Sequence, residues 1–282
     1  MPSPTEITVA QLQRLIGLPD APLVVDVRID EHFAEDPRLL PGSQRRDYRA
    51  LRDWAPRYAG RRVVVSCQWG LKLSQGAVAL LRNEGVEAES LEGGFEAWRN
   101  AGGPLLKAAQ LPPRDERGRT LWVTRARPKI DRIACPWLIR RFVDPGAVFL
   151  FVAPSEVLAV GERFGATPFD VEDVFWSHRG DRCTFDTMID ELGLQSPALD
   201  QLATIVRGAD TARMDLAPQA AGLLAASLGF SRMHKDDLVQ LDAVMPLYDA
   251  FYRWCRDASE ESHNWPAATV AKAAGDDGKR AR

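Results

Sequence analysis

Residues 63 to 83 decide the fold of the first half of the chain. They read Val63-Val64-Val65-Ser66-Cys67-Gln68-Trp69-Gly70-Leu71-Lys72, followed by Leu73-Ser74-Gln75-Gly76-Ala77-Val78-Ala79-Leu80-Leu81-Arg82-Asn83. The β-branched valines predict a short buried strand, and apolar residues at three- and four-residue spacing after Lys72 predict a helix. The cysteine at position 67 therefore falls between the carboxyl end of a strand and the N-terminus of a helix.

This position predicts a reactive thiol. Unpaired backbone N–H groups and the positive end of the helix dipole collect there, and both favour an anion. We expect Cys67 to ionise more readily than a free thiol, with Lys72 acting in the same direction, and to be open to small anions. The residues expected to form the backbone cradle are Gln68, Trp69, Gly70, Leu71 and Leu73. The alternative is that Cys67 is an inert, buried apolar residue.

Two further motifs flank the loop. They are Val24-Val25-Asp26-Val27-Arg28 before it and Leu91-Glu92-Gly93-Gly94-Phe95-Glu96-Ala97-Trp98 after it. With the loop they resemble the rhodanese domain, over about residues 5 to 104. The resemblance implies that Cys67 carries a sulfane sulfur as a persulfide and passes it to a nucleophile.

The resemblance also implies roles for neighbouring residues. Lys72 stands where the family usually has a basic residue, and Asp26 and Arg28 match its early strand motif. We therefore predict Cys67, Lys72, Asp26 and Arg28 as the catalytic set. Leu73 stands where many members have serine or another polar residue.

A cysteine-dependent phosphatase or oxyanion reductase is a neighbouring alternative for this loop. Such a site needs an arginine six residues after the cysteine, because a planar guanidinium clamps the oxygens of the substrate. The sequence has Leu73 at that position. The phosphatase interpretation is therefore disfavoured.

The composition of the chain limits the classes of protein to which it can belong. The chain has 282 residues, a formal net charge of -3, and 45% hydrophobic and 27% charged residues, which predicts two globular domains without a broad nucleic-acid or membrane surface. The sequence shows no apolar run long enough to span a membrane and no secretory signal at its start. Its four cysteines are far apart, so we expect reduced thiols in the cytoplasm.

The order of expected elements gives the architecture. Strands alternating with helices predict an α/β rhodanese-like domain with a mainly parallel sheet, and the later helical patterns predict a second, mainly helical α+β domain. We expect the first domain at residues 1–104, a charged linker at 105–119, the second domain at 120–257 and a mobile tail at 258–282.

The second half contains three long motifs. They are Asp131-Arg132-Ile133-Ala134-Cys135-Pro136-Trp137-Leu138-Ile139-Arg140-Arg141-Phe142, Ser177-His178-Arg179-Gly180-Asp181-Arg182-Cys183-Thr184-Phe185-Asp186 and Ile205-Val206-Arg207-Gly208-Ala209-Asp210-Thr211. They resemble the C-terminal domain shared by regulators and accessory proteins of the chromate-resistance family. The resemblance covers about residues 120 to 257 and implies a link to chromate stress.

Basic residues cluster at the start of this half. Six of them lie within seventeen residues: Arg125, Arg127, Lys129, Arg132, Arg140 and Arg141. Pro136 is expected in the first turn of a helix, which would place Cys135 near its N-terminus. We predict an anion pocket for chromate or sulfate at Arg127, Arg132 and Arg140. The alternative is a set of surface arginines paired with nearby aspartates.

A metal or acid–base cluster is a second candidate in this half. His178, Asp186 and Asp210 offer ligands for a divalent ion, and Cys183 would bias the site toward zinc. The alternative is a structural, hydrogen-bonded His178. Cys135 and Cys183 could exchange sulfur or electrons with Cys67 if the domains dock; buried inert thiols are the simpler expectation.

The sequence thus predicts a sulfurtransferase associated with chromate stress. Its partners would be a small anionic sulfur donor and a thiol acceptor, with chromate or sulfate as a candidate ligand and neither nucleic acid nor membrane as a target. Sulfur transfer itself would need no cofactor, and a divalent metal is a candidate only in the second domain. The alternative is a non-enzymatic redox or oxyanion sensor switched by oxidation of Cys67.

Overall fold

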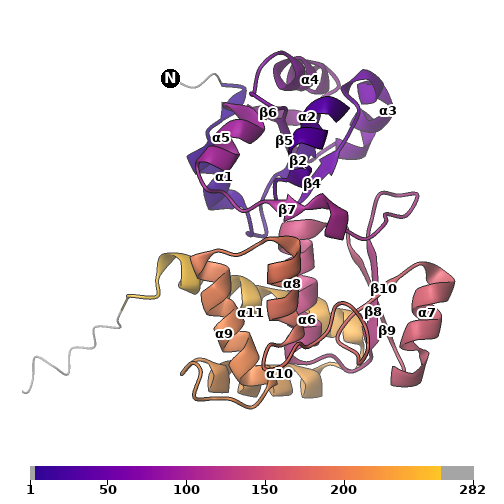
Figure 1. Ribbon diagram of the computed structural model, residues 1–282, viewed down its shortest axis with the longest axis vertical. Helices are drawn as coiled ribbons and strands as arrows, with labels where there is room; N and C mark the ends of the chain where they lie inside the picture. The colour runs from indigo at the N-terminus through magenta and orange to yellow at the C-terminus, as the bar shows by residue number, and fades with distance from the viewer. Residues whose placement is uncertain (1–3, 262–282) are drawn as a thin grey trace, which may run out of the picture.

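The computed structural model describes residues 4–261, so most of the expected tail lies outside the described residues. The first part, coloured indigo to purple, lies above the second part in Figure 1. It contains a five-stranded parallel sheet in the order β1-β6-β5-β2-β4. The strands are β1 (Glu6–Ile7), β2 (Leu23–Asp26), β4 (Ser43–Arg45), β5 (Arg62–Ser66) and β6 (Glu87–Leu91). The predicted α/β parallel-sheet class is confirmed.

Helices cover this sheet, and local sequence signals explain several of their ends. The helices are α1 (Val9–Leu15), α2 (Asp30–Glu35), α3 (Leu51–Trp54), α4 (Lys72–Asn83) and α5 (Gly94–Asn100), with 3-10 turns η1 (Tyr48–Ala50) and η2 (Ala55–Tyr58). Thr8 and Gln11 form a capping box at the start of α1. In β5, the centre of the sheet, Val63 to Val65 are fully buried, as their β-branched run predicts.

The second part combines a small parallel sheet with many helices. Its strands are β8 (Leu121–Arg125), β9 (Val148–Val152) and β10 (Thr167–Pro168), in the order β10-β8-β9. The longer helices are α6 (Ile130–Leu138), α7 (Val157–Phe164), α8 (Thr184–Leu192), α9 (Pro197–Asp210), α10 (Ala220–Met233) and α11 (Asp237–Asp257). Ser196 caps α9, and Pro197 is its first residue, a position where proline lacks no needed hydrogen bond. The mainly helical class of this part is confirmed.

Helix α6 begins earlier than the sequence suggested. It starts at Ile130, so Pro136 lies inside the helix rather than in its first turn, and Cys135 is not near the N-terminus. Proline has no N–H to donate and its ring crowds the preceding turn, which disturbs the regular hydrogen bonding. The chain continues directly into the π-helical turn η4 (Ile139–Val143). Burial of the apolar stripe overrides the positional preference of proline.

The two parts are packed against each other. Residues 105–119, expected to be a linker, include β7 (Leu106–Lys107), which pairs antiparallel with β3 (Arg38–Leu39), and the 3-10 turn η3 (Ala108–Gln110). Leu106 is fully buried. The Gly42 N–H donates to the Phe142 carbonyl at 2.6 Å across the boundary. One apolar core therefore includes residues of both parts.

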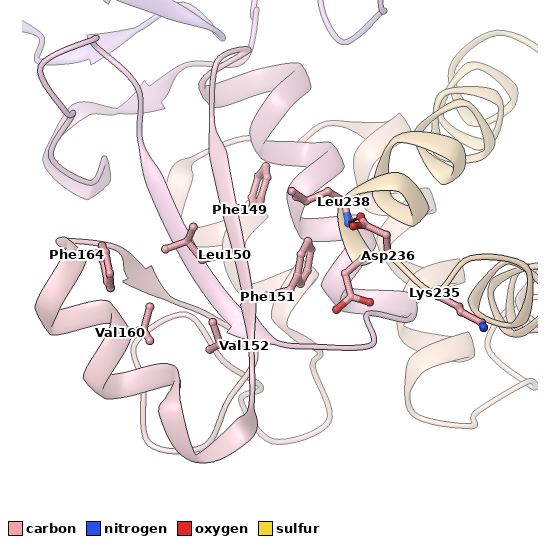
Figure 2. Close-up of a pocket in the computed structure, with 10 residues that line it drawn as sticks. Phe149, Leu150, Phe151, Val152, Val160, Phe164, Lys235, Asp236 and Leu238 are labelled. Carbon is pink, nitrogen blue, oxygen red and sulfur yellow. Dashed lines mark hydrogen bonds between the residues drawn. The ribbon is translucent and has the colours of Figure 1, made fainter.

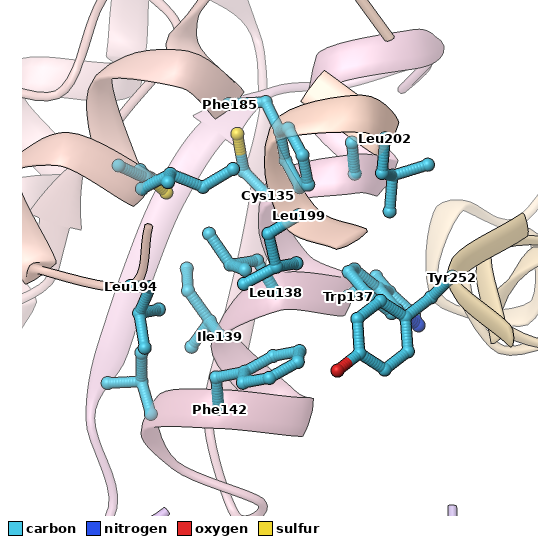
Figure 3. Close-up of a cluster of buried hydrophobic side chains, with 14 of the residues drawn as sticks. Cys135, Trp137, Leu138, Ile139, Phe142, Phe185, Leu194, Leu199, Leu202 and Tyr252 are labelled. Atoms are coloured by element: carbon cyan, nitrogen blue, oxygen red, sulfur yellow. The ribbon is translucent and has the colours of Figure 1, made fainter. Parts of the chain in front are cut away.

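The largest section of this core lies in the second part. Figure 3 shows its centre, in which Trp137 and Phe142 of the α6–η4 segment face Phe185 and Tyr252 from α8 and α11. The ring centroids of Trp137 and Tyr252 lie 5.5 Å apart, and those of Phe142 and Tyr252 lie 5.4 Å apart. These aromatic contacts fix α11 against the segment that docks onto the first part.

Strand β9 lies at one edge of the small sheet and borders a shallow groove of about 580 Å³. Figure 2 shows Phe149 and Phe151 on the side of Leu238, whereas Leu150 and Val152 point toward the α7 side. Within residues 4–261, no helix is both long and apolar enough to cross a membrane.

Candidate functional site

The loop after β5 is anchored by the start of α5. The Phe95 N–H donates to the Cys67 carbonyl at 2.9 Å, and the Glu96 N–H donates to the Gln68 carbonyl at 3.1 Å. Gly94 has φ of +60°, and a Cβ there would lie 2.2 Å from the Cys67 carbonyl oxygen. The Gly93-Gly94 pair is thus required for the close approach of two backbone segments.

The backbone of this loop has unused hydrogen-bond donors. In the part of the chain that the structure describes, no hydrogen bond is donated by the N–H groups of residues 68 to 73. The last two of these residues open α4, whose first-turn N–H groups have no partner within the helix. Such a set of free amides can stabilise an anion, as the sequence predicts for a thiolate cradle.

The thiol lies beneath the loop. Cys67 is 4% exposed, so the expectation of a thiol open to small anions is not met in this conformation. Its Sγ lies 3.2 Å from Oγ of Ser74, a fully buried residue of α4 whose hydroxyl is also 3.2 Å from the Leu71 carbonyl. The hydroxyl missing at Leu73 is therefore supplied by the next residue.

The outer surface of the loop is apolar and exposed. Trp69 is 53% exposed and Leu71 is 59% exposed. The Trp69 ring meets the His32 ring of α2 edge-on, with centroids 4.6 Å apart. Lys72 is also exposed, at the first position of α4, where an approaching anion would meet it. These residues lie on the solvent side of the thiol loop.

Asp26 and Arg28, predicted as part of the catalytic set, lie next to the loop as a buried pair. They form a buried ion pair with a 2.7 Å contact, and Arg28 also donates to the carbonyls of Asp36 and Arg38. The Arg28 guanidinium lies 3.8 Å from the centre of the Phe95 ring. The pair therefore connects the end of β2, the segment after α2 and the helix that anchors the thiol loop, which is a positioning role.

The predicted anion pocket is not formed by the three arginines proposed for it. Arg127 donates to carbonyls at the end of α10, including His234 at 3.0 Å. Arg132 pairs with Asp170 at 3.3 Å, and Arg140 pairs with Asp242 at 2.8 Å. Each guanidinium has its own partner on a different element. The alternative of separately paired arginines fits this geometry.

A cluster of three carboxylates and one imidazole lies in the second part. Nε2 of His178 is 3.5 Å from Asp131, 3.4 Å from Asp170 and 3.3 Å from Asp210. Asp131 comes from α6, Asp170 follows β10, His178 lies in the segment before α8, and Asp210 ends α9. We call these four residues the His178 cluster. The structure thus brings together His178 and Asp210, two of the three predicted ligands.

The third predicted ligand, Asp186, is placed elsewhere. Its carboxylate pairs with Arg207 and accepts a hydrogen bond from the Cys183 N–H at 3.1 Å. Sequence reasoning missed Asp131 and Asp170. Asp131 carried a signal, since a carboxylate in a fully buried helix requires partners. Asp170 lies in an irregular segment, where no spacing points to the cluster.

Burial and charge shift the protonation of the cluster. The carboxylates of Asp131, Asp170 and Asp210, in that order, raise the pKa of His178 to about 12. Burial raises the pKa of Asp131 to about 7. Burial alone would raise the pKa of Asp170 too, but its contacts with His178 and Thr184 lower it below the ordinary value.

The other cysteines are buried in the second part. Burial raises the pKa values of Cys135 and Cys183 well above that of a free thiol, and nearby carboxylates act in the same direction. Burial also raises the pKa of Cys255 to about 11. These properties are those of inert structural thiols. Cys67 packs in a separate apolar cluster from these three residues.

Each half of the chain matches a known protein family. Residues 8–101 match the family described as the Rhodanese-like domain, and residues 122–255 match the family described as ChrB, C-terminal domain. The chain contains a rhodanese-like domain followed by a ChrB C-terminal domain. The rhodanese-like domain includes the Cys67 loop, and the ChrB C-terminal domain includes the His178 cluster.

The chain is also similar to individual proteins and solved structures. Protein ChrB from Cupriavidus metallidurans is 28% identical, with a match covering 74% of this chain and 71% of the relative. A rhodanese-related protein from Thermoplasma volcanium has 25% identity and a TM-score of 0.32, covering 36% of this chain and 97% of that one. A rhodanese-like domain protein from Staphylococcus aureus has 27% identity and a TM-score of 0.30, covering 33% and 90%. The assignment rests on the family matches rather than on these low TM-scores.

Proposed function

We propose that this protein is a sulfurtransferase that carries a sulfane sulfur as a persulfide on Cys67. The observation that carries the proposal is the set of unused N–H groups at residues 68 to 73, in the loop that begins with the cysteine. These donors can stabilise a negative charge on the thiolate and on the outer sulfur of a persulfide. The rhodanese-like family match supports the same chemistry.

The reaction would proceed in two steps. The Cys67 thiolate attacks the outer sulfur of thiosulfate, so a cysteine–sulfur bond forms, the sulfur–sulfur bond of thiosulfate breaks and sulfite leaves with the bonding electron pair. A thiolate or cyanide then attacks the outer sulfur of the persulfide and releases the Cys67 thiolate. No external oxidant or reductant is consumed, since the two transfers balance.

The surrounding residues would have distinct tasks. Exposed Lys72 attracts the anionic donor, and the Ser74 hydroxyl at 3.2 Å hydrogen-bonds the sulfur in its charged state. Because Cys67 is buried, the donor would reach it only when the loop moves. Burial would also shield the persulfide from bulk solvent.

We further propose that this activity serves chromate resistance in the cytoplasm. The support is the ChrB C-terminal domain and the similarity of the chain to Protein ChrB. Chromate oxidises thiols and resembles sulfate in charge and shape, so sulfur transfer would restore thiol chemistry that chromate damages.

The test is steady-state turnover of thiosulfate with cyanide or a small thiol as acceptor. Wild-type protein and Cys255→Ser are expected to turn over at similar rates, whereas Cys67→Ser is expected to be inactive. Cys255 is a matched control because it is also a buried cysteine, but on α11 of the other domain. Absence of turnover in the wild type, combined with a conformational change on oxidation of Cys67, would overturn the proposal in favour of a redox sensor.

A further inference from the structure

The His178 cluster has a geometry that its own hydrogen bonds do not explain. Three carboxylates converge on one atom, Nε2 of His178, at 3.3–3.5 Å. A single ring N–H points in one direction and makes a good hydrogen bond with one acceptor at about 2.9 Å. Three acceptors at longer, nearly equal distances therefore exceed what the imidazole can satisfy.

These distances suit a shared ion. Four ligand atoms placed tetrahedrally around a cation at about 2.1 Å lie about 3.4 Å from one another. The distances from Nε2 of His178 to Asp131 and Asp170, 3.5 and 3.4 Å, agree with that spacing, whereas Asp210 contacts Nε2 but does not belong to the mutually close set of ligand atoms. One ligand atom from each of Asp131, Asp170 and His178 can be chosen so that all lie within 4.8 Å of one another.

An unpartnered atom gives a second, independent indication. Asp131 is 1% exposed, and its carboxylate faces His178 through Oδ2, which also accepts the Thr184 N–H at 2.6 Å. Its other oxygen, Oδ1, is buried and has no hydrogen-bond partner in the described part of the chain. An unpaired buried carboxylate oxygen is costly in an apolar interior, and a cation bound by this carboxylate would offset that cost.

We propose that Asp131, Asp170 and His178 bind one divalent transition-metal ion. Carboxylate and imidazole donors without a thiolate suit Mn²⁺, Fe²⁺ or Zn²⁺ rather than soft metals, and Cys183 is not among the converging atoms.

Charge and access both favour such a site. The carboxylates of Asp131 and Asp170 balance the charge of a divalent ion, and Arg125 and Arg132, each 3.3 Å from Asp170, offset the nearby negative charge of Asp210. The His178 side chain is 42% exposed, so an ion can enter from solvent without opening the core.

The experiment uses the full chain after removal of metal by chelation. Mn²⁺ is titrated and followed by electron paramagnetic resonance, and Zn²⁺ is titrated by calorimetry. The wild type is expected to bind one ion per chain, and His178→Ala and Asp170→Asn to bind at least about 10–100-fold more weakly. The control variants are His234→Ala and Asp181→Asn, which change a histidine and an aspartate outside the cluster and are expected to bind as the wild type does.

A second readout separates binding from folding. The melting temperature of the metal-free His178→Ala variant shows whether it folds, and added ion is expected to raise the melting temperature of the wild type but not of this variant. No saturable one-equivalent binding of Mn²⁺ or Zn²⁺ by the wild type would overturn the proposal and leave the cluster as an ion-paired network. Equal binding by wild type and a folded His178→Ala would also overturn it. Cys67→Ser is expected to bind metal normally.

Discussion

The thiol loop and the His178 cluster are built in opposite ways. The loop is a continuous segment from Cys67 to Ser74, and its proposed donors are backbone N–H groups. The cluster gathers side chains from four segments between residues 131 and 210. The first site depends on how the chain is bent locally, and the second on how distant elements pack. The two sites should therefore fail under different substitutions.

The largest expected effect comes from the ion pair beneath the thiol loop. Arg28→Ala leaves the carboxylate of Asp26 buried without its partner, and we expect it to lower the free energy of unfolding by about 3–5 kcal/mol. Asp30→Ala is the control, because the Asp30–Arg45 pair is exposed, and we expect it to cost less than about 1 kcal/mol. Urea denaturation measures both. Equal effects would contradict the structural role of the buried pair.

A glycine substitution tests the dependence of the loop on its backbone. Gly94→Ala adds a left-handed strain and a Cβ at 2.2 Å from the Cys67 carbonyl oxygen, so we expect a loss of about 2–4 kcal/mol and of persulfide loading. Gly85→Ala is matched, since Gly85 also has a positive φ but no atom near its Cβ position. We expect it to cost about 1 kcal/mol and to keep persulfide loading. Similar losses in both variants would show that strain alone matters.

The role of Ser74 predicts a smaller effect. Ser74→Ala removes the hydroxyl 3.2 Å from the sulfur and keeps the backbone, so we expect persulfide formation to slow about fivefold, equivalent to about 1 kcal/mol. Stopped-flow mixing with thiosulfate measures the rate, and unfolding in urea controls for stability. An unchanged rate in a stable variant would remove Ser74 from the site.

Thiol reactivity sharpens the contrast between the two domains. Because burial raises their pKa values, Cys135 and Cys183 are expected to resist iodoacetamide at neutral pH in the folded protein. Burial raises the pKa of Cys255 to about 11. At pH values below 11, its labelling rate should therefore rise about tenfold for each unit by which the pH is increased, because the thiolate fraction rises by that factor. Peptide mass spectrometry gives the rates. Rapid labelling of Cys135 near pH 7 would contradict its burial.

Local signals in the sequence were sufficient for the thiol loop but not for the cluster. The valines of β5 form the buried strand predicted for them, and the capping box at Thr8 and the cap at Ser196 are short-range features of the same kind. His178 contacts both Asp131 and Asp170, which belong to different elements. The spacing of these residues in the sequence does not predict how those elements pack. The arginines predicted to form an anion pocket show the same limit of sequence reasoning, because Arg140 pairs with Asp242 of the distant helix α11. Proximity in sequence suggested a shared pocket, whereas tertiary packing gave each its own carboxylate or carbonyl.

Intact-mass spectrometry after exposure to thiosulfate tests the central claim most directly. The wild-type chain is expected to gain the mass of one sulfur atom and to lose it on treatment with a thiol. The Cys67→Ser variant is expected to show no gain in mass. A gain that persists in Cys67→Ser, or a wild type that gains nothing, would contradict the assignment of Cys67 as the sulfur carrier.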